Sequence, residues 1–167
     1  MRLHALRKRY VAIARRYVEY MTDAPDIVVS GPPFPTSTEA ARELVLRNWF
    51  ESSRSLDALC RARSIHYLHV LQPTLNDPGS KPLTAAEIKD GTCLPSWLDG
   101  VRYGYPRMRE LGARLREIGV QFVDGSYAFR DVGETLYHDP CHFSQRGNEL
   151  LAELIAASIL ERERSTN

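Results

Sequence analysis

The sequence predicts an α/β domain, a three-layer sandwich with a parallel sheet between helical layers. Three observations lead to this prediction. Helical patterns alternate with short apolar segments, these segments are rich in β-branched and aromatic residues, and the segments between them are long enough for crossover helices. Strands joined by such crossovers normally run parallel in one sheet. At 167 residues the chain has the length of one domain, and we predict a single domain over residues 1–167.

The first half of the chain predicts two helices and one strand. Apolar residues recur at helical spacing over residues 3–21, and a β-branched strand is expected at residues 26–30. A capping box formed by Thr36 and Glu39 opens a second helix, which runs to about Arg63. We expect its inner face to carry Ala41, Val45, Trp49, Leu56 and Leu59.

The second half continues the same alternation. The expected elements are a strand at 64–73, a long loop at 74–104 with one helical turn at 84–89, a helix at about 105–118, a strand at 120–125, and a final helix after the loop 126–144. Ligands of parallel sheets bind outside the carboxyl ends of the strands. A site is therefore expected at the loops that follow the strands, at 31–37, 72–104 and 124–144.

Composition excludes several classes of function. The apolar fraction of 43% and the charged fraction of 26% are ordinary for a globular protein, and the net charge of +1 gives no global field for nucleic acid or membrane. Basic residues crowd the first sixteen positions, which most often marks one solvated helix face. No apolar run is long enough for a membrane span, and no signal peptide is visible. Three cysteines make no disulfide framework, so the compartment stays open.

Asp139 and His142 are the candidate catalytic residues. They stand three apart in the loop that follows the last predicted strand and precedes the last helix, within YHDPCHFSQRGNELLAELIAASIL. A histidine can act as a general base toward a hydroxyl nucleophile, and a carboxylate that binds its other ring nitrogen fixes the productive tautomer. The alternative is a structural helix start, in which Asp139 forms a turn before Pro140. A metal site of His138, Asp139, Cys141 and His142 is a weaker alternative, and we expect neither a metal nor a cofactor.

At these residues the sequence resembles a known family. The segment DPCHFSQRGNELLAELIA is similar to the last sequence block of the SGNH (GDSL-like) hydrolases, and YLHVLQPTL followed by KPLTAAEIK is similar to their penultimate strand region. The resemblance spans roughly residues 24–160 and is specific chiefly in its last 25 residues. It implies a flavodoxin-like sheet and a serine esterase that acts on a small-molecule or glycan ester. It also implies that His142 is the general base and Asp139 its orienting carboxylate.

The resemblance stops at the nucleophile. The family places Gly-Asp-Ser after the first strand and Gly-x-Asn-Asp after a later one, and this chain contains neither; Asn76-Asp77 lacks the glycine. Two explanations remain: the chain is the carboxyl part of a longer enzyme, or it is an inactive α/β binding module. We expect the first, because the basic helix begins at Met1 without a preceding strand and three strands make a thin sheet. Uncovered sheet edges and helix faces would then favour self-association.

Other candidates carry weaker signals. Ser30 ends a predicted strand at the same edge of the sheet, but no helix start follows it to supply an oxyanion hole. Cys93 and Cys141 lie in loops at this edge, where they form a disulfide only in an oxidising compartment. We expect His66 and His69 to be sheet or core histidines and Gln72 to end its strand. The aromatic residues of the long loop either line a pocket or anchor the loop; they are Trp97, Tyr103 and Tyr105.

Overall fold

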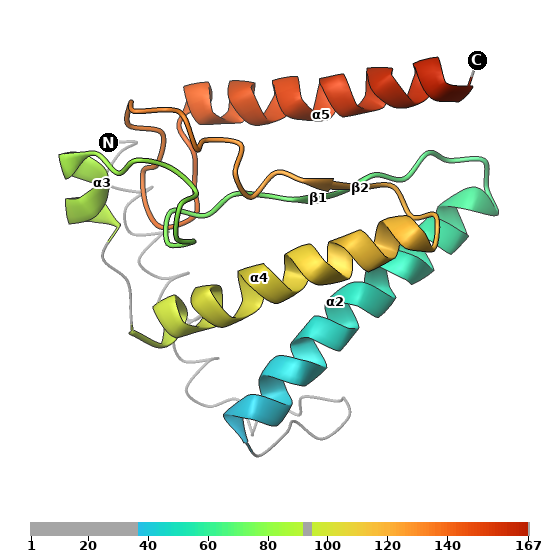
Figure 1. Cartoon of the computed structure of the whole chain (residues 1–167), viewed down its shortest axis with the longest axis horizontal. Helices are drawn as coiled ribbons and strands as arrows, with labels where there is room; N and C mark the ends of the chain where they lie inside the picture. The colour runs from blue at the N-terminus through green and yellow to red at the C-terminus, as the bar shows by residue number, and fades with distance from the viewer. Residues whose placement is uncertain (1–36, 92–94, 167) are drawn as a thin grey trace, which may run out of the picture. The chain divides into compact units, whose positions relative to one another are not determined.

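The structure is a computed structural model of the chain, and it describes residues 37–91 and 95–166 (Figure 1). All of them belong to the unit Pro35–Asn167, the second of two units into which the chain divides. The order of elements in this unit is α2, β1, α3, α4, β2 and α5. The predicted helix at 3–21 and the predicted strand at 26–30 lie outside the described residues.

The two described strands form a parallel sheet, as the alternation predicted. β1 spans His69–Leu71 and β2 spans Phe122–Asp124, and His69 lies opposite Phe122 in the register. Both strands are shorter than the predicted segments 64–73 and 120–125. A residue counts as part of a strand only where it pairs with a neighbouring strand. In the described part of the chain, β1 pairs with β2 alone and over three residues, so both strands are short. The α/β character with a parallel pair of strands is thus confirmed.

Helix α2 spans Thr38–Arg61 and begins at Ser37, whose Oγ accepts the N–H of Ala40 at 3.2 Å. Its buried face differs from the predicted one. Leu46 and Ser53 are buried and Trp49 packs against the core, but three predicted inner residues are exposed, namely Val45, Leu56 and Leu59. The helix has a second apolar stripe beside the one that faces α4, and the sequence pattern did not distinguish the two.

Helix α4 spans Pro95–Glu117 and begins ten residues before its predicted start. Residues 95–104 were predicted to belong to a loop because the segment 74–104 is rich in Pro, Gly, Asp and Thr. The apolar spacing nevertheless continues through Leu98 and Val101 at helical intervals, and Pro95 occupies the first helical position, where its missing N–H costs nothing. A glycine weakens a helix by only about 1 kcal/mol, so packing against α2 and the strands outweighs it.

The remaining helices agree with the sequence. The predicted turn at 84–89 is α3 (Ala85–Asp90), with a complete capping box between Thr84 and Glu87. The final helix is α5 (Gln145–Thr166). In Figure 1, α4 and α2 lie on one side of the strand pair and α5 on the other. Gly125, just after β2, packs closely under α5, since a Cβ there would be 3.4 Å from Leu151 and Leu154.

Two apolar clusters form the core. The first joins the sheet to α4, and its buried members are Leu71, Leu115, Val120 and Phe122. Trp49 and Phe50 of α2 pack against it. The second lies beneath the loops at the carboxyl ends of the strands, and its buried members are Leu75, Phe129, Leu136 and Tyr137. Leu150 of α5 packs against this second cluster. The loops after β1 and β2, which were expected to carry a site, therefore pack on this second apolar cluster.

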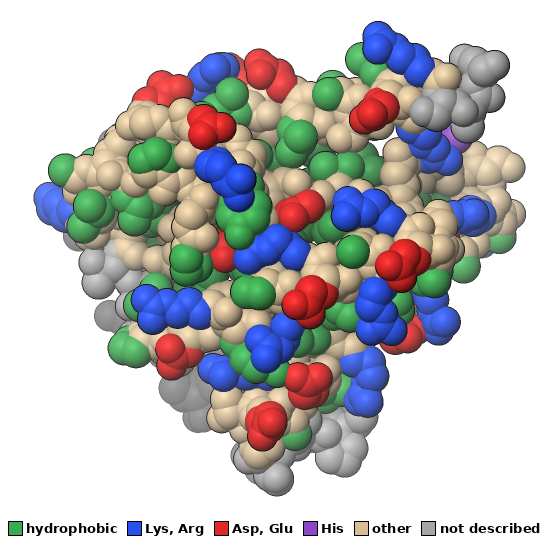
Figure 2. All heavy atoms as spheres, viewed as in Figure 1, with side chains coloured by type: hydrophobic (Ala, Val, Ile, Leu, Met, Phe, Trp, Pro, Cys, Tyr) green, Lys and Arg blue, Asp and Glu red, His purple; other side chains and the backbone are tan. Residues whose placement is uncertain are grey.

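Side-chain charges of both signs are interspersed over the face that Figure 2 shows, and hydrophobic side chains lie among them. This mixed distribution agrees with a net charge of +1 and shows no single-sign stripe for nucleic acid on that face. Among the described residues, no helix is both long enough and apolar enough to span a bilayer.

Candidate active site

Asp139 and His142 contact each other directly in the loop between β2 and α5. Their Oδ2 and Nδ1 atoms are 2.6 Å apart. The other carboxylate oxygen, Oδ1, accepts the backbone N–H groups of Cys141 and His142, each at 2.8 Å. Asp139 thus forms the local turn that the structural alternative required, and it also binds the imidazole ring. The predicted contact between these two side chains is present.

The charge state of Asp139 fixes the roles of both side chains. The backbone N–H of Cys141, followed by the His142 ring and its backbone N–H, lowers the pKa of Asp139 well below its usual range. An ionised carboxylate only accepts hydrogen bonds, so the hydrogen between the two groups belongs to Nδ1 of His142. The neutral ring then carries its lone pair on Nε2. With 76% of its side chain exposed, His142 is accessible to a substrate.

The loop that carries the pair is held at its base and at its tip. At the base, Tyr137 and Phe143 form an antiparallel bridge, and the N–H of His138 donates to the carbonyl of His142 at 3.0 Å. At the tip, the carbonyl of Pro140 accepts hydrogen bonds from the N–H of Leu75 at 3.1 Å and from Thr74 Oγ1 at 3.0 Å. Since Thr74 and Leu75 follow β1, the loops after both strands meet at one edge of the sheet, as predicted.

A nucleophile is not visible among residues 37–91 and 95–166. The ring of His142 has two recorded side-chain partners there, Asp139 and Cys141, whose Sγ lies 3.7 Å from Nδ1. Burial and the nearby Asp139 charge raise the pKa of the Cys141 thiol, which opposes formation of a reactive thiolate. Ser30 lies outside the described residues, as does Cys93, so the structure bears on neither the serine candidate nor the Cys93–Cys141 pair.

The same loop contains the ligand-type atoms of Asp139, Cys141 and His142 within 4.8 Å of one another. The carboxylate already accepts three hydrogen bonds, two from backbone N–H groups and one from the ring. This pattern is that of an oriented histidine, and we assign no metal to it.

The weaker candidates have structural roles in the described part of the chain. Nδ1 of His69 lies 2.7 Å from Ser53 Oγ, so His69 is the sheet and core histidine that was predicted. The same prediction is wrong for His66, which is exposed and precedes the strand. Tyr105 donates to the carbonyl of Gln72 at 3.1 Å, which anchors α4 to the end of β1. The Asn76 side-chain nitrogen is buried, so it does not face a substrate at the exposed His142 ring.

The aromatic residues of α4 also anchor rather than line a pocket. The ring of Tyr103 stacks with the guanidinium groups of Arg42 and Arg107, and its hydroxyl donates to Glu43. Trp97, at the start of the helix, remains 47% exposed. Of the two roles predicted for these aromatics, anchoring is the one seen for Tyr103 and Tyr105.

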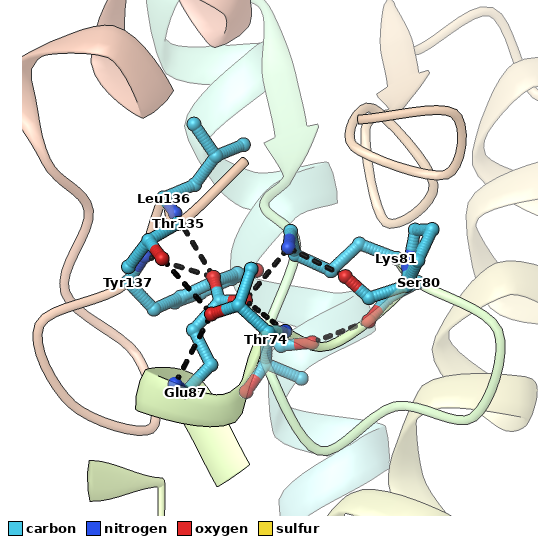
Figure 3. Close-up of polar contacts among 9 residues, drawn as sticks. Thr74, Ser80, Lys81, Glu87, Thr135, Leu136 and Tyr137 are labelled. Carbon is cyan, nitrogen blue, oxygen red and sulfur yellow. Dashed lines mark hydrogen bonds and ion pairs between the residues drawn. The ribbon is translucent and has the colours of Figure 1, made fainter. Parts of the chain in front are cut away.

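The sequence did not predict two ion pairs beside the site, of which one is fully buried and the other partly buried. Lys81 and Glu87 are 2.7 Å apart with fully buried side chains, and Arg109 lies 2.6 Å from Asp77. Figure 3 shows the Glu87 carboxylate at the centre of contacts from Lys81 and Thr84, which precede α3, and from Leu136 and Tyr137. Burial raises the pKa of Glu87, but hydrogen bonds from Lys81, Thr84 and Leu136 together lower it to about 2.

The only sequence signal for the Glu87 cluster was the capping box, because Thr84 and Glu87 have the required spacing. That motif predicts a helix start and leaves the glutamate exposed to solvent. It carries no information about Lys81 or about the loop fifty residues further along the chain, so the burial of the pair could not be anticipated.

Comparison with known proteins adds no family assignment. No protein-family model matches the chain, and no match is found among curated proteins or among solved structures. The geometry of the site and the sequence resemblance are therefore the two observations that bear on the function of this protein.

Proposed function

We propose that this protein is an SGNH-type hydrolase of carboxylic esters, in which Asp139 and His142 form the base half of a Ser-His-Asp site. The observation that carries the proposal is the 2.6 Å contact between Asp139 Oδ2 and His142 Nδ1 in a loop beyond the carboxyl end of β2. In this arrangement Nε2 would take the proton of a serine hydroxyl, and the carboxylate would stabilise the imidazolium that forms. The parallel strands support a three-layer, flavodoxin-like fold for the whole domain.

The serine and the oxyanion donors would come from residues outside the described part. The proposed substrate is a small-molecule or glycan ester, because the family that the sequence resembles acts on such bonds. A different reading is a non-catalytic α/β module that retains the loop for structural reasons. It is favoured by the absence, within residues 37–91 and 95–166, of a serine that contacts His142.

The test is hydrolysis of a short-chain nitrophenyl ester by the polypeptide of the complete reading frame, including any codons that precede Met1. We expect turnover that disappears in His142→Ala and falls by roughly 10⁴-fold in Asp139→Asn, as in a serine protease triad whose histidine takes the wrong tautomer. His138→Ala is the matched control, because His138 is an exposed neighbour that uses only its backbone N–H in the loop. A fluorophosphonate probe identifies the reactive serine.

The 167-residue chain by itself is expected to hydrolyse the ester no faster than its His142→Ala variant, since loss of even one oxyanion donor costs about 2.7–4 kcal/mol of barrier. Serine-type turnover by this chain that requires His142 would contradict the expectation, and Ser30 would be the first residue to replace. Absence of turnover in the complete polypeptide would instead favour the binding module.

A further inference from the structure

The carboxylate of Glu87 binds two different parts of the chain with its two oxygens. Oε1 accepts the backbone N–H groups of Leu136 at 2.9 Å and Tyr137 at 3.2 Å. Oε2 accepts Lys81 Nζ at 2.7 Å and the N–H and hydroxyl of Thr84 at 2.9 and 3.1 Å. Figure 3 shows these contacts converging from opposite sides of the carboxylate. A single side chain therefore ties the start of α3 to the segment that precedes Asp139.

The two backbone groups that Glu87 binds lie at the base of the loop with the catalytic pair. Leu136 also accepts the N–H of Ser144 at 2.6 Å, and Tyr137 bridges to Phe143. These contacts close the loop over residues 138–142. Glu87 is thus the fixed point on one side of the loop, and the Thr74–Leu75 contact with Pro140 is the fixed point on the other.

The stability of the fold alone does not account for an ionised pair at this position. Removing two charges from water is costly, and well-packed apolar side chains of similar volume are often as stable or more stable. An apolar side chain, however, offers no acceptor to the N–H groups of Leu136 and Tyr137. The carboxylate accepts on both oxygens, and Lys81 supplies the charge that keeps it ionised in the interior.

We propose that Glu87, paired with Lys81, is a positioning residue for the Asp139–His142 pair. It fixes the base of the loop so that the carboxylate and the imidazole keep one mutual geometry, which a general base requires. The catalytic role of this positioning rests on the proposed function, but the effect of Glu87 on the loop does not. The experiment therefore measures the geometry of His142 directly and uses no activity measurement.

The experiment measures the His142 ring tautomer by long-range ¹H–¹⁵N correlation in the full 167-residue chain, at a pH where the ring is neutral. The wild-type ring is expected in the Nδ1–H form that Asp139 binds. In Glu87→Gln an NH2 group, which donates hydrogen bonds, replaces one carboxylate oxygen. The side chain can then no longer accept hydrogen bonds both from Lys81 and Thr84 and from Leu136 and Tyr137. We expect loss of the Nδ1–H preference and at least about tenfold faster hydrogen exchange at the amides of Leu136 and Tyr137.

Leu46→Ala is the control for general destabilisation, because Leu46 is buried on α2. It should lower the unfolding temperature and leave the His142 tautomer unchanged. If Glu87→Gln does not fold, the double variant Lys81→Met/Glu87→Met tests the positioning role instead, since it removes both charges and keeps a similar side-chain volume. It should fold, free the two amides and lose the tautomer preference.

An unchanged tautomer in the folded variants would overturn the proposal, and so would failure of both variants to fold, which would make the pair a stability element only. The proposed function fails separately: a lost tautomer preference together with an inactive complete polypeptide would keep the positioning role and reject the hydrolase.

Discussion

Two histidines of this chain show how neighbouring groups decide what an imidazole can do. His142 is exposed and bound to an ionised carboxylate, so its free nitrogen is oriented toward solvent as an acceptor. His69 is enclosed by Trp49, Phe122 and Ser53, and burial lowers its pKa. Ser53 is itself only 2% exposed, so the Ser53–His69 contact cannot receive a substrate. A histidine with a hydrogen-bonded side-chain partner is therefore structural at position 69 and a candidate for catalysis at position 142.

The buried His69 predicts a loss of stability in weak acid. Its folded pKa is below the value of 6.5 for an unperturbed histidine, so the unfolded chain binds a proton more readily than the folded chain as the pH falls through this window. Well above this value the histidine is neutral in both states and the stability is at its full value. The free energy of unfolding should decrease below this pH by at most about 1.4 kcal/mol per pH unit for this one group.

Urea unfolding from about pH 7.5 to about pH 5.5 measures the effect, with His69→Gln as the reference. Glutamine keeps a polar contact with Ser53 but does not titrate, so the wild type should lose more stability than the variant across the range. Equal slopes would show that His69 is not the group responsible.

The packing of α4 on β2 is decided by a single glycine. Gly112 lies against the ring of Phe122, and a Cβ at this position would be 2.1 Å from the nearest ring atom. Gly100, in the same helix, has no atom within 4 Å of the corresponding point. Gly112 and Gly100 therefore have opposite roles, although the sequence pattern of the helix does not distinguish them.

Replacing each glycine by alanine separates these roles. Gly112→Ala should overpack the first core cluster and destabilise the protein by about 1–3 kcal/mol, because Phe122 must shift. Gly100→Ala should be neutral or stabilising by up to about 1 kcal/mol through helix propensity. Urea unfolding of both variants measures the difference. If Gly112→Ala proves as stable as Gly100→Ala, the close contact between Gly112 and Phe122 does not limit the packing of α4 on β2.

The errors of the sequence prediction also lie at the scale of elements. Alternation of helices and strands predicted the parallel pairing of β1 with β2, since crossover connections leave few other arrangements. The start of α4 was missed because glycine and proline were weighted above the apolar spacing of Leu98, Val101 and Tyr105. The buried face of α2 was missed because an amphipathic pattern gives the direction of an apolar stripe but not the neighbour that covers it.

The candidate site was predictable where its signal is local. Asp139 and His142 are three residues apart in one loop, so their contact follows from the sequence. The Lys81–Glu87 pair and its contact with Leu136 join segments about fifty residues apart, and only the folded chain brings them together. Local spacing thus predicts the chemistry of the loop, while the contacts that hold the loop in place depend on the whole domain.

At the scale of the whole molecule, the exposed apolar stripe of α2 predicts self-association. Val45, Leu56 and Leu59 are 59%, 48% and 54% exposed on the helix that the sequence placed with this face inward. Burying one leucine contributes about 1.5–3 kcal/mol, so a contact through this stripe would be sensitive to a single charge. In Leu56→Glu we expect association to weaken by at least about tenfold, as measured by sedimentation velocity over a dilution series.

Ala58→Glu, an exposed change on another face of the same helix, should leave association unchanged. A wild-type chain that stays monomeric throughout the series would reject the prediction, and equal weakening by both variants would reject the stripe as the contact.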